Sequence, residues 1–176
     1  MKRTSFSHRY LPEFVYGGID GAVTTFAVVA GALGASLSTS IILILGFANL
    51  FADGFSMAVS NYLSTKSRRE LVKHTRQTAH VETPRSTAFA TFASFLLVGF
   101  VPLLSFVIGL WVVSFEQHTF TYSFILTGIA LAIVGGVKGI VVKKSVSYAA
   151  LETLVIGGVA AALAFAVGFV LRGIIA

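Results

Sequence analysis

Long apolar segments alternate with short polar stretches along the chain of 176 residues. Each apolar run is continuous and about 20 residues long, which is typical of a helix that crosses a bilayer and unlike the alternating pattern of a membrane β-barrel. The pattern therefore predicts an all-α membrane protein in which residues 1–176 form a single transmembrane domain. The five predicted transmembrane helices cover residues 14–35, 41–62, 86–110, 122–142 and 149–171.

Two of these segments need an interpretation of their own. A signal peptide could explain residues 14–35, but the run is long, is interrupted by Asp20 and is followed at once by further spans. We therefore predict that it is retained as the first helix. Pro102 lies inside the segment 86–110, and a membrane helix tolerates proline where neighbours or a local distortion satisfy the freed carbonyl. We predict one continuous helix there, and an extension of the second helix into residues 64–85 until Pro84 breaks it.

The composition excludes a water-soluble domain. Hydrophobic residues make up 56% of the chain, charged residues only 11%, and the mean hydropathy is +0.88. The net charge of +6 could suggest a nucleic-acid partner. However, the basic residues form short clusters between apolar segments, which is typical of cytoplasmic loops, so we expect no nucleic acid. The absence of cysteine excludes disulfides and thiolate metal sites.

The distribution of lysine and arginine predicts the orientation in the bilayer. With five spans, 12 of the 13 basic residues fall on one side, and Arg172 alone falls on the other. By the positive-inside rule the N-terminus is cytoplasmic, residues 64–85 form a cytoplasmic basic segment, and the C-terminus is outside. The residues on the cytoplasmic side are Lys2, Arg3, Arg9, Lys66, Arg68, Arg69, Lys73, Arg76, Arg85, Lys138, Lys143 and Lys144.

The second predicted helix carries a stripe of potential metal ligands. Asn49, Asp53 and Met57 are four residues apart, so they share one helical face over roughly 12 Å. An amide oxygen, a carboxylate and a thioether can all bind a divalent cation. Counted from the cytoplasmic edge, Asp20 of the first helix lies at the depth of Met57, with Asp53 one turn deeper and Asn49 two turns deeper. A carboxylate at such depth is costly unless it faces a partner, water or an ion, so the sequence predicts a metal site at Asp20, Asn49, Asp53 and Met57.

Each of these residues could also have a purely structural role. Met57 could be apolar filler, and Asn49 could hydrogen-bond between helices. Glu152, Glu70 and His74 are weaker metal candidates. A carboxylate at Glu152 could be favoured simply by the positive end of the helix dipole and by nearby Lys144. The basic surroundings of Glu70 and His74 favour a solvated or lipid-facing surface for these two residues. A membrane scaffold whose polar groups only pair helices is therefore the alternative, whereas no Ser-His, Cys or His-rich constellation supports an enzyme.

Three segments carry a resemblance to a known family. Residues 20–35 (DGAVTTFAVVAGALGA), 46–70 (GFANLFADGFSMAVSNYLSTKSRRE) and 151–168 (LETLVIGGVAAALAFAVG) are similar to the vacuolar iron transporter family. The resemblance implies a dimeric five-helix exporter that moves ferrous iron, and often manganese, out of the cytosol in exchange for protons. It also implies a pathway at the dimer interface, with an aspartate matching Asp20 and a methionine matching Met57.

The chain departs from the plant members of that family in two places. They have an acid two turns before the methionine, where this chain has Asn49, and Asp53 stands one turn before the methionine instead. They also carry a glutamate-rich metal-binding domain after the second helix, which residues 66–85 are too short to form. The resemblance is therefore to a short, bacterial-type member, which favours the inner membrane of a prokaryotic cell, with a vacuolar membrane as the alternative.

These inferences combine into one functional hypothesis. We expect a proton-coupled exporter of Fe²⁺ or Mn²⁺ with no resident cofactor and no enzymatic activity, whose partners are the metal ion, protons, the lipid bilayer and a second copy of the chain. We expect the homodimer to form through the first two helices, because the small-residue faces at Gly17, Gly21, Gly31 and Gly54 suit a close partner.

Overall fold

A computed structural model describes residues 6–75, 82–112 and 118–175 of the chain. Every regular element in these ranges is a helix, so the all-α prediction is confirmed. The helices are α1 (Phe6–Gly34), α2 (Thr39–His74), α3 (Pro84–Gly99), α4 (Val101–Gly109), α6 (Thr119–Val141) and α7 (Val146–Ile175).

Four of these helices are long and apolar enough to cross a membrane by themselves: α1, α2, α6 and α7. The short helices α3 and α4 meet the same criteria only as a bent pair. Counting that pair as one span gives the five spans that the sequence pattern predicts. The chain is therefore a multi-pass membrane protein with four or five spans.

The prediction of a continuous helix over residues 86–110 is wrong. Helix α3 ends at Gly99, α4 begins at Val101, and the two axes differ by 45°. The cause is Pro102, which has no N–H to donate and whose ring clashes with the carbonyl four residues earlier. A neighbouring helix stabilises the break, because the Ser123 hydroxyl of α6 donates a 2.6 Å hydrogen bond to the Pro102 carbonyl.

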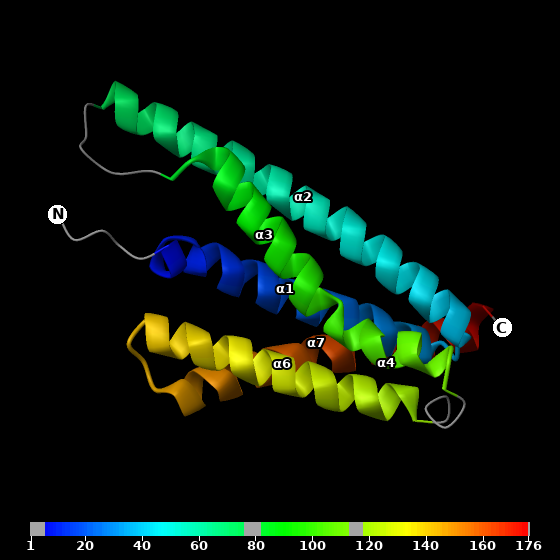
Figure 1. Ribbon diagram of the computed structural model, residues 1–176. Helices are drawn as coiled ribbons and strands as arrows, with labels where there is room; N and C mark the ends of the chain where they lie inside the picture. The colour runs from blue at the N-terminus through cyan, green and yellow to red at the C-terminus, as the bar shows by residue number, and fades with distance from the viewer. Residues whose placement is uncertain (1–5, 76–81, 113–117, 176) are drawn as a thin grey trace.

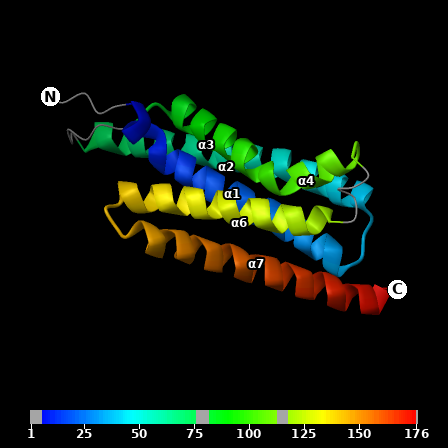
Figure 2. The same ribbon diagram turned by 60° about the horizontal axis from the view of Figure 1, so that its bottom comes forward.

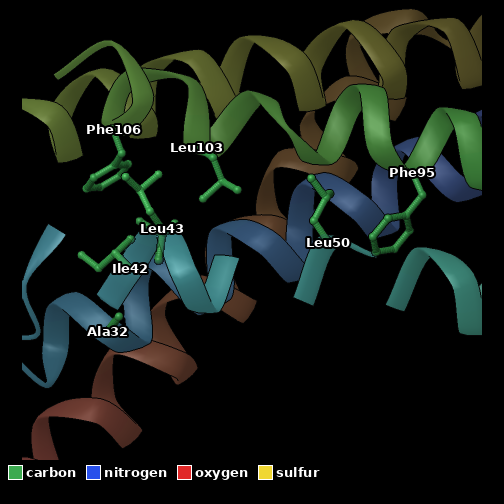
Figure 3. Packing of buried hydrophobic residues seen from close by; sticks show 8 residues of the cluster. Ala32, Ile42, Leu43, Leu50, Phe95, Leu103 and Phe106 are labelled. Carbon is green, nitrogen blue, oxygen red and sulfur yellow. The ribbon is translucent and has the colours of Figure 1, made fainter. Parts of the chain in front are cut away.

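Helix α1 lies at the centre of the bundle and packs against α2, α3, α6 and α7. Figures 1 and 2 show α2 and α3 on one side of α1, and α6 and α7 on the other. The largest core cluster fills the space between α1, α2 and the bent pair α3–α4 (Figure 3). Its members are Val29, Ala32, Ile42, Leu43, Leu50, Phe95, Leu103 and Phe106. This core fixes α1 against α2, the two helices that carry the predicted metal ligands.

The glycines of α1 and α2 pack closely against other helices of the same chain. A Cβ at Gly17 would lie 2.6 Å from the Thr91 carbonyl oxygen of α3, and one at Gly21 would lie 2.5 Å from that of Phe95. Gly31 packs against the backbone of α7, and Gly54 packs against α3. The interpretation of these glycines as a surface for a second copy is therefore wrong, because small-residue spacing reveals close packing but not the helix that fills the space.

The two ends of the bundle differ in charge. The far end of α2 and the α6–α7 connection lie at the end where α1 begins, whereas the C-terminus lies at the opposite end beside the α1–α2 turn (Figure 1). The predicted extension of α2 is confirmed as far as His74, although Pro84 begins α3 rather than ending α2. Basic residues of this extension and of the α6–α7 connection thus share one end. At the other end Arg172 donates a hydrogen bond to the Ser36 hydroxyl.

Candidate functional site

Two acids on neighbouring helices come together within the apolar part of the bundle. Asp20 is half-buried on α1, Asp53 is exposed on α2, and their carboxyl groups are close enough to interact electrostatically. Two negative charges that interact in an apolar environment repel each other. A cation or a proton between them removes that repulsion, which makes the pair suitable for binding either.

The other two residues of the α2 stripe have different surroundings. Asn49 is half-buried, and its side-chain nitrogen is buried without a hydrogen-bond partner among the described residues. The amide nitrogen is a donor, so a hydrogen-bond acceptor would satisfy it, whereas a cation could bind only the amide oxygen. Met57 is also half-buried and packs against the core cluster that contains Phe95. The structure thus gives Met57 a packing role, while its place on the helix still lies one turn from Asp53.

Glu13 is a further candidate residue that the sequence prediction did not include. It lies in α1, and one of its carboxylate oxygens is buried with no hydrogen-bond partner in the described part of the chain. Seven residues separate it from Asp20, so two helical turns place both acids on one face roughly 10 Å apart. That spacing was the available signal. It was overlooked because the first helix was expected to begin at residue 14, whereas α1 already includes residues 6–13.

Asp20 also borders a cavity of about 340 Å³ on the side of α6 and α7. Lys138 of α6 lines the same cavity, and its ammonium forms a 2.9 Å ion pair with Glu152 of α7. The carboxylate of Glu152 is therefore already paired with a lysine. The cavity gives Asp20 a second approach, separate from the face that it shares with α2.

The remaining candidates lie far along the α2 extension. Glu70 and His74 are both exposed there, in the last two turns of the helix. In the ranges that the structure describes, no group of three or more His, Asp or Glu side chains could hold a metal ion. A site at Asp20 and Asp53 therefore needs the amide of Asn49, the thioether of Met57, backbone carbonyls, water or a second chain to complete its ligands.

Comparison with known proteins identifies the family. The VIT family profile matches residues 11–83 and 75–169. A vacuolar iron transporter of Plasmodium berghei is 25% identical over 230 aligned positions, which cover 96% of this chain and 84% of that protein. Vacuolar iron transporter 1 of Arabidopsis thaliana is 24% identical, covering 91% of this chain and 85% of that protein. A vacuolar iron transporter of Toxoplasma gondii reaches 43% identity over 74 residues, which are 42% of this chain and 24% of that protein. The chain belongs to the VIT family, a family of membrane transporters and not of enzymes.

Proposed function

We propose that this protein exports a divalent cation, Fe²⁺ or Mn²⁺, from the cytosol in exchange for protons. The observation that carries the proposal is the pair of carboxylates at Asp20 and Asp53 on adjacent helices of an apolar bundle. Charged groups in membrane helices are rare and are associated with ion pathways and proton relays. The names of the relatives, which are vacuolar iron transporters, support iron as the cargo.

The donor set supports the choice of metal. Carboxylates alone favour Mg²⁺ or Ca²⁺, whereas an added thioether at Met57 favours a borderline transition-metal ion. The amide oxygen of Asn49 would be a further neutral ligand on the same stripe. Proton exchange follows from the same residues, because two carboxylates that repel each other can bind either a divalent cation or protons.

A second copy of the chain would complete the site. Asp53 is exposed on α2, and a carboxylate that faces lipid is costly in free energy. Covering this face of α2 with the same face of a partner would remove Asp53 from lipid and double the number of ligands around a two-fold axis. The glycines of α1 are not needed for this contact, since they already seat α3 and α7.

The proposal is tested by metal flux in proteoliposomes. Purified protein is reconstituted with a pH dye and a metal-sensitive dye inside the vesicles, and Mn²⁺ or Fe²⁺ is added outside. A transporter gives metal entry with simultaneous release of protons from the lumen. A scaffold gives neither signal above empty vesicles, and metal entry with no pH change would reject proton exchange alone.

Expression in cells tests the direction of transport. The basic end of the bundle would face the cytosol by the positive-inside rule, so metal would enter near the start of α1 and the extension of α2. We expect cells that express the protein to tolerate higher Mn²⁺ or Fe²⁺ in the medium and to hold less cytosolic metal than control cells. Increased cytosolic metal in expressing cells would argue for import. The inner membrane of a prokaryotic cell or a vacuolar membrane would each suit this direction.

Glu13 should contribute to cation entry. One oxygen of its carboxylate is buried without a hydrogen-bond partner among the described residues, and the side chain lies two turns before Asp20 on the same helical face. We expect Glu13→Gln to raise the half-saturating Mn²⁺ concentration by roughly tenfold, the effect of about 1.4 kcal/mol, and to leave the maximal rate largely intact. Flux measured over a range of Mn²⁺ concentrations checks this. An unchanged half-saturating concentration would assign Glu13 to structure alone.

A further inference from the structure

Four basic side chains line one cavity where α2 leaves its apolar part and α3 begins. The cavity has a volume of about 370 Å³. Lys66, Arg69 and Lys73 lie three and four residues apart, so they share one face of α2, and Arg85 comes from the first turn of α3. Glu70 is the one acid that lines the cavity with them. Like charges held so close together repel, and an anion between them would remove this cost.

The start of α3 adds to the positive character of the cavity. Thr83 and Pro84 also line it, and Pro84 is the first residue of this 16-residue helix. Pro84 has no N–H, and the N–H groups of Ser86 and Thr87 donate to the Thr83 carbonyl, which leaves the N–H of Arg85 and the partial positive charge of the helix end to face a ligand. Side chains and helix end therefore favour the same kind of ligand, a negatively charged oxygen group such as a phosphate.

An apolar groove continues directly from this basic cavity. It has a volume of about 360 Å³ and shares Tyr62 and Arg85 with the basic cavity. Its other lining residues are apolar side chains of α2 and α3: Phe55, Ala58, Val59, Ala88, Phe89 and Phe92. Phe55 lies about two turns before Tyr62, and Phe92 about two turns after Arg85, so the groove runs toward the middle of the bilayer.

We infer that this composite site binds an anionic phospholipid, with the phosphate in the basic cavity and an acyl chain in the groove between α2 and α3. Free phosphate would use the first part only, and a lipid that carries no phosphate or other anionic group would gain nothing from the four cations. The site lies where the apolar residues of α2 give way to the basic residues 66–73, and a basic segment that follows a membrane span is expected at the level of the lipid headgroups. Its basic character also suits the anionic lipids of the cytoplasmic leaflet, the side predicted for this end of the bundle.

The charge requirement is tested with the full-length protein in detergent. Binding of dioleoyl-phosphatidylglycerol is measured by native mass spectrometry for the parent and for the triple variant Lys66→Gln, Arg69→Gln and Lys73→Gln. The matched control is Arg68→Gln, Lys143→Gln and Lys144→Gln, which removes the same charge from residues that do not line the cavity. We expect the first variant to bind about tenfold more weakly or worse, and the control to bind within about twofold of the parent. Equal binding by all three proteins, or equal loss in both variants, would overturn the inference.

A second experiment distinguishes a lipid from free phosphate. Ala88→Phe narrows the groove and leaves the basic cavity unchanged, and Ala166→Phe on the exposed surface of α7 serves as its control. Should Ala88→Phe fail to fold, Ala58→Val narrows the same groove with a smaller side chain. We expect the groove variant alone to lose phosphatidylglycerol, and millimolar inorganic phosphate not to displace the lipid from the parent. Displacement by inorganic phosphate together with an ineffective groove variant would assign the cavity to a free anion.

A third experiment asks whether a second copy of the chain covers the groove instead. Phe89 is 72% exposed, and the chain contains no cysteine, so Phe89→Cys introduces a single thiol into the groove. In vesicles that contain phosphatidylglycerol, we expect this variant to remain uncrosslinked under mild oxidation. Efficient formation of a disulfide-linked dimer would show that another protein chain occupies the groove and would overturn the lipid assignment.

Discussion

Replacing Asp53 by Asn is expected to abolish metal-driven proton release while leaving the fold intact. The amide has nearly the volume of the carboxylate, and Asp53 is exposed on α2, so the substitution leaves no cavity. It removes the charge that the stripe offers to a cation, because position 49 supplies only a neutral amide. If that charge contributes about 2 kcal/mol to metal binding, affinity falls about thirtyfold, so almost no site is occupied at the metal concentration that half-saturates the parent, where the signal is measured. Metal entry and luminal pH are recorded in proteoliposomes that contain equal amounts of protein.

Two further variants test whether charge on the stripe is the cause. Asn49→Glu in the Asp53→Asn background should restore part of the activity, because it returns a negative charge to the same helical face. Asn49→Ala in the parent should have a milder effect than Asp53→Asn. Glu70→Gln provides the matched control, since this acid is exposed near the end of α2, far along the helix from Asp53. If Asp53→Asn transports like the parent, the pathway would have to depend on Asp20 and Met57 without Asp53.

The largest expected effect on stability comes from Gly21→Leu. A Cβ at this position would lie 2.5 Å from the Phe95 carbonyl oxygen and 3.0 Å from its Cα, and backbone atoms cannot move aside as a flexible side chain can. Helix α1 would have to separate from α3 and disturb the core that contains Phe95. We expect a loss of about 3 kcal/mol or more in the free energy of unfolding, at the upper end of overpacking effects. Circular dichroism and gel filtration after heating measure the loss.

The control for this variant is Gly158→Leu on α7. No atom lies within 4 Å of a Cβ built at Gly158, so the larger side chain meets open space there. Leucine also favours a helix over glycine by roughly 1 kcal/mol, which predicts equal or higher stability. A Gly21→Leu protein that unfolds at the temperature of the parent would contradict the close packing of α1 on α3.

The sequence was sufficient to predict the spans, and the structure shows why it was not sufficient for the details within them. Continuous apolar runs indicate helices in lipid whatever their neighbours are, so the four long helices follow from composition. The α2 extension to His74 is polar and basic, and it was predicted because no proline interrupts the chain between α2 and Pro84. The break before Pro102 could not be predicted from composition, because the neighbouring helices decide whether a proline breaks a membrane helix or only distorts it locally. In this protein Ser123 of α6 provides the bond that stabilises the bend.

The candidate site was predictable to a similar extent. Helical spacing and depth counting predict Asp20 and Asp53 in the same region of two helices, and α1 and α2 do pack against each other; a metal site there stays a prediction. The same spacing rule would have included Glu13, but that residue lies before the apolar run, where composition no longer marks the helix. Met57 packs against the core because α3 brings Phe95 close to it. The spacing of residues along α2 does not predict where α3 lies.

Binding of Mn²⁺ to the purified protein is the most direct test of the central proposal, that Asp20 and Asp53 together bind the transported cation. Electron paramagnetic resonance distinguishes free from bound Mn²⁺, so a titration gives affinity without any need for transport. The parent and the Glu70→Gln control should show the same saturable binding, and the Asp20→Asn, Asp53→Asn double variant should lose it while eluting from gel filtration like the parent. Saturable binding of unchanged affinity in the double variant would contradict a metal site at these two carboxylates.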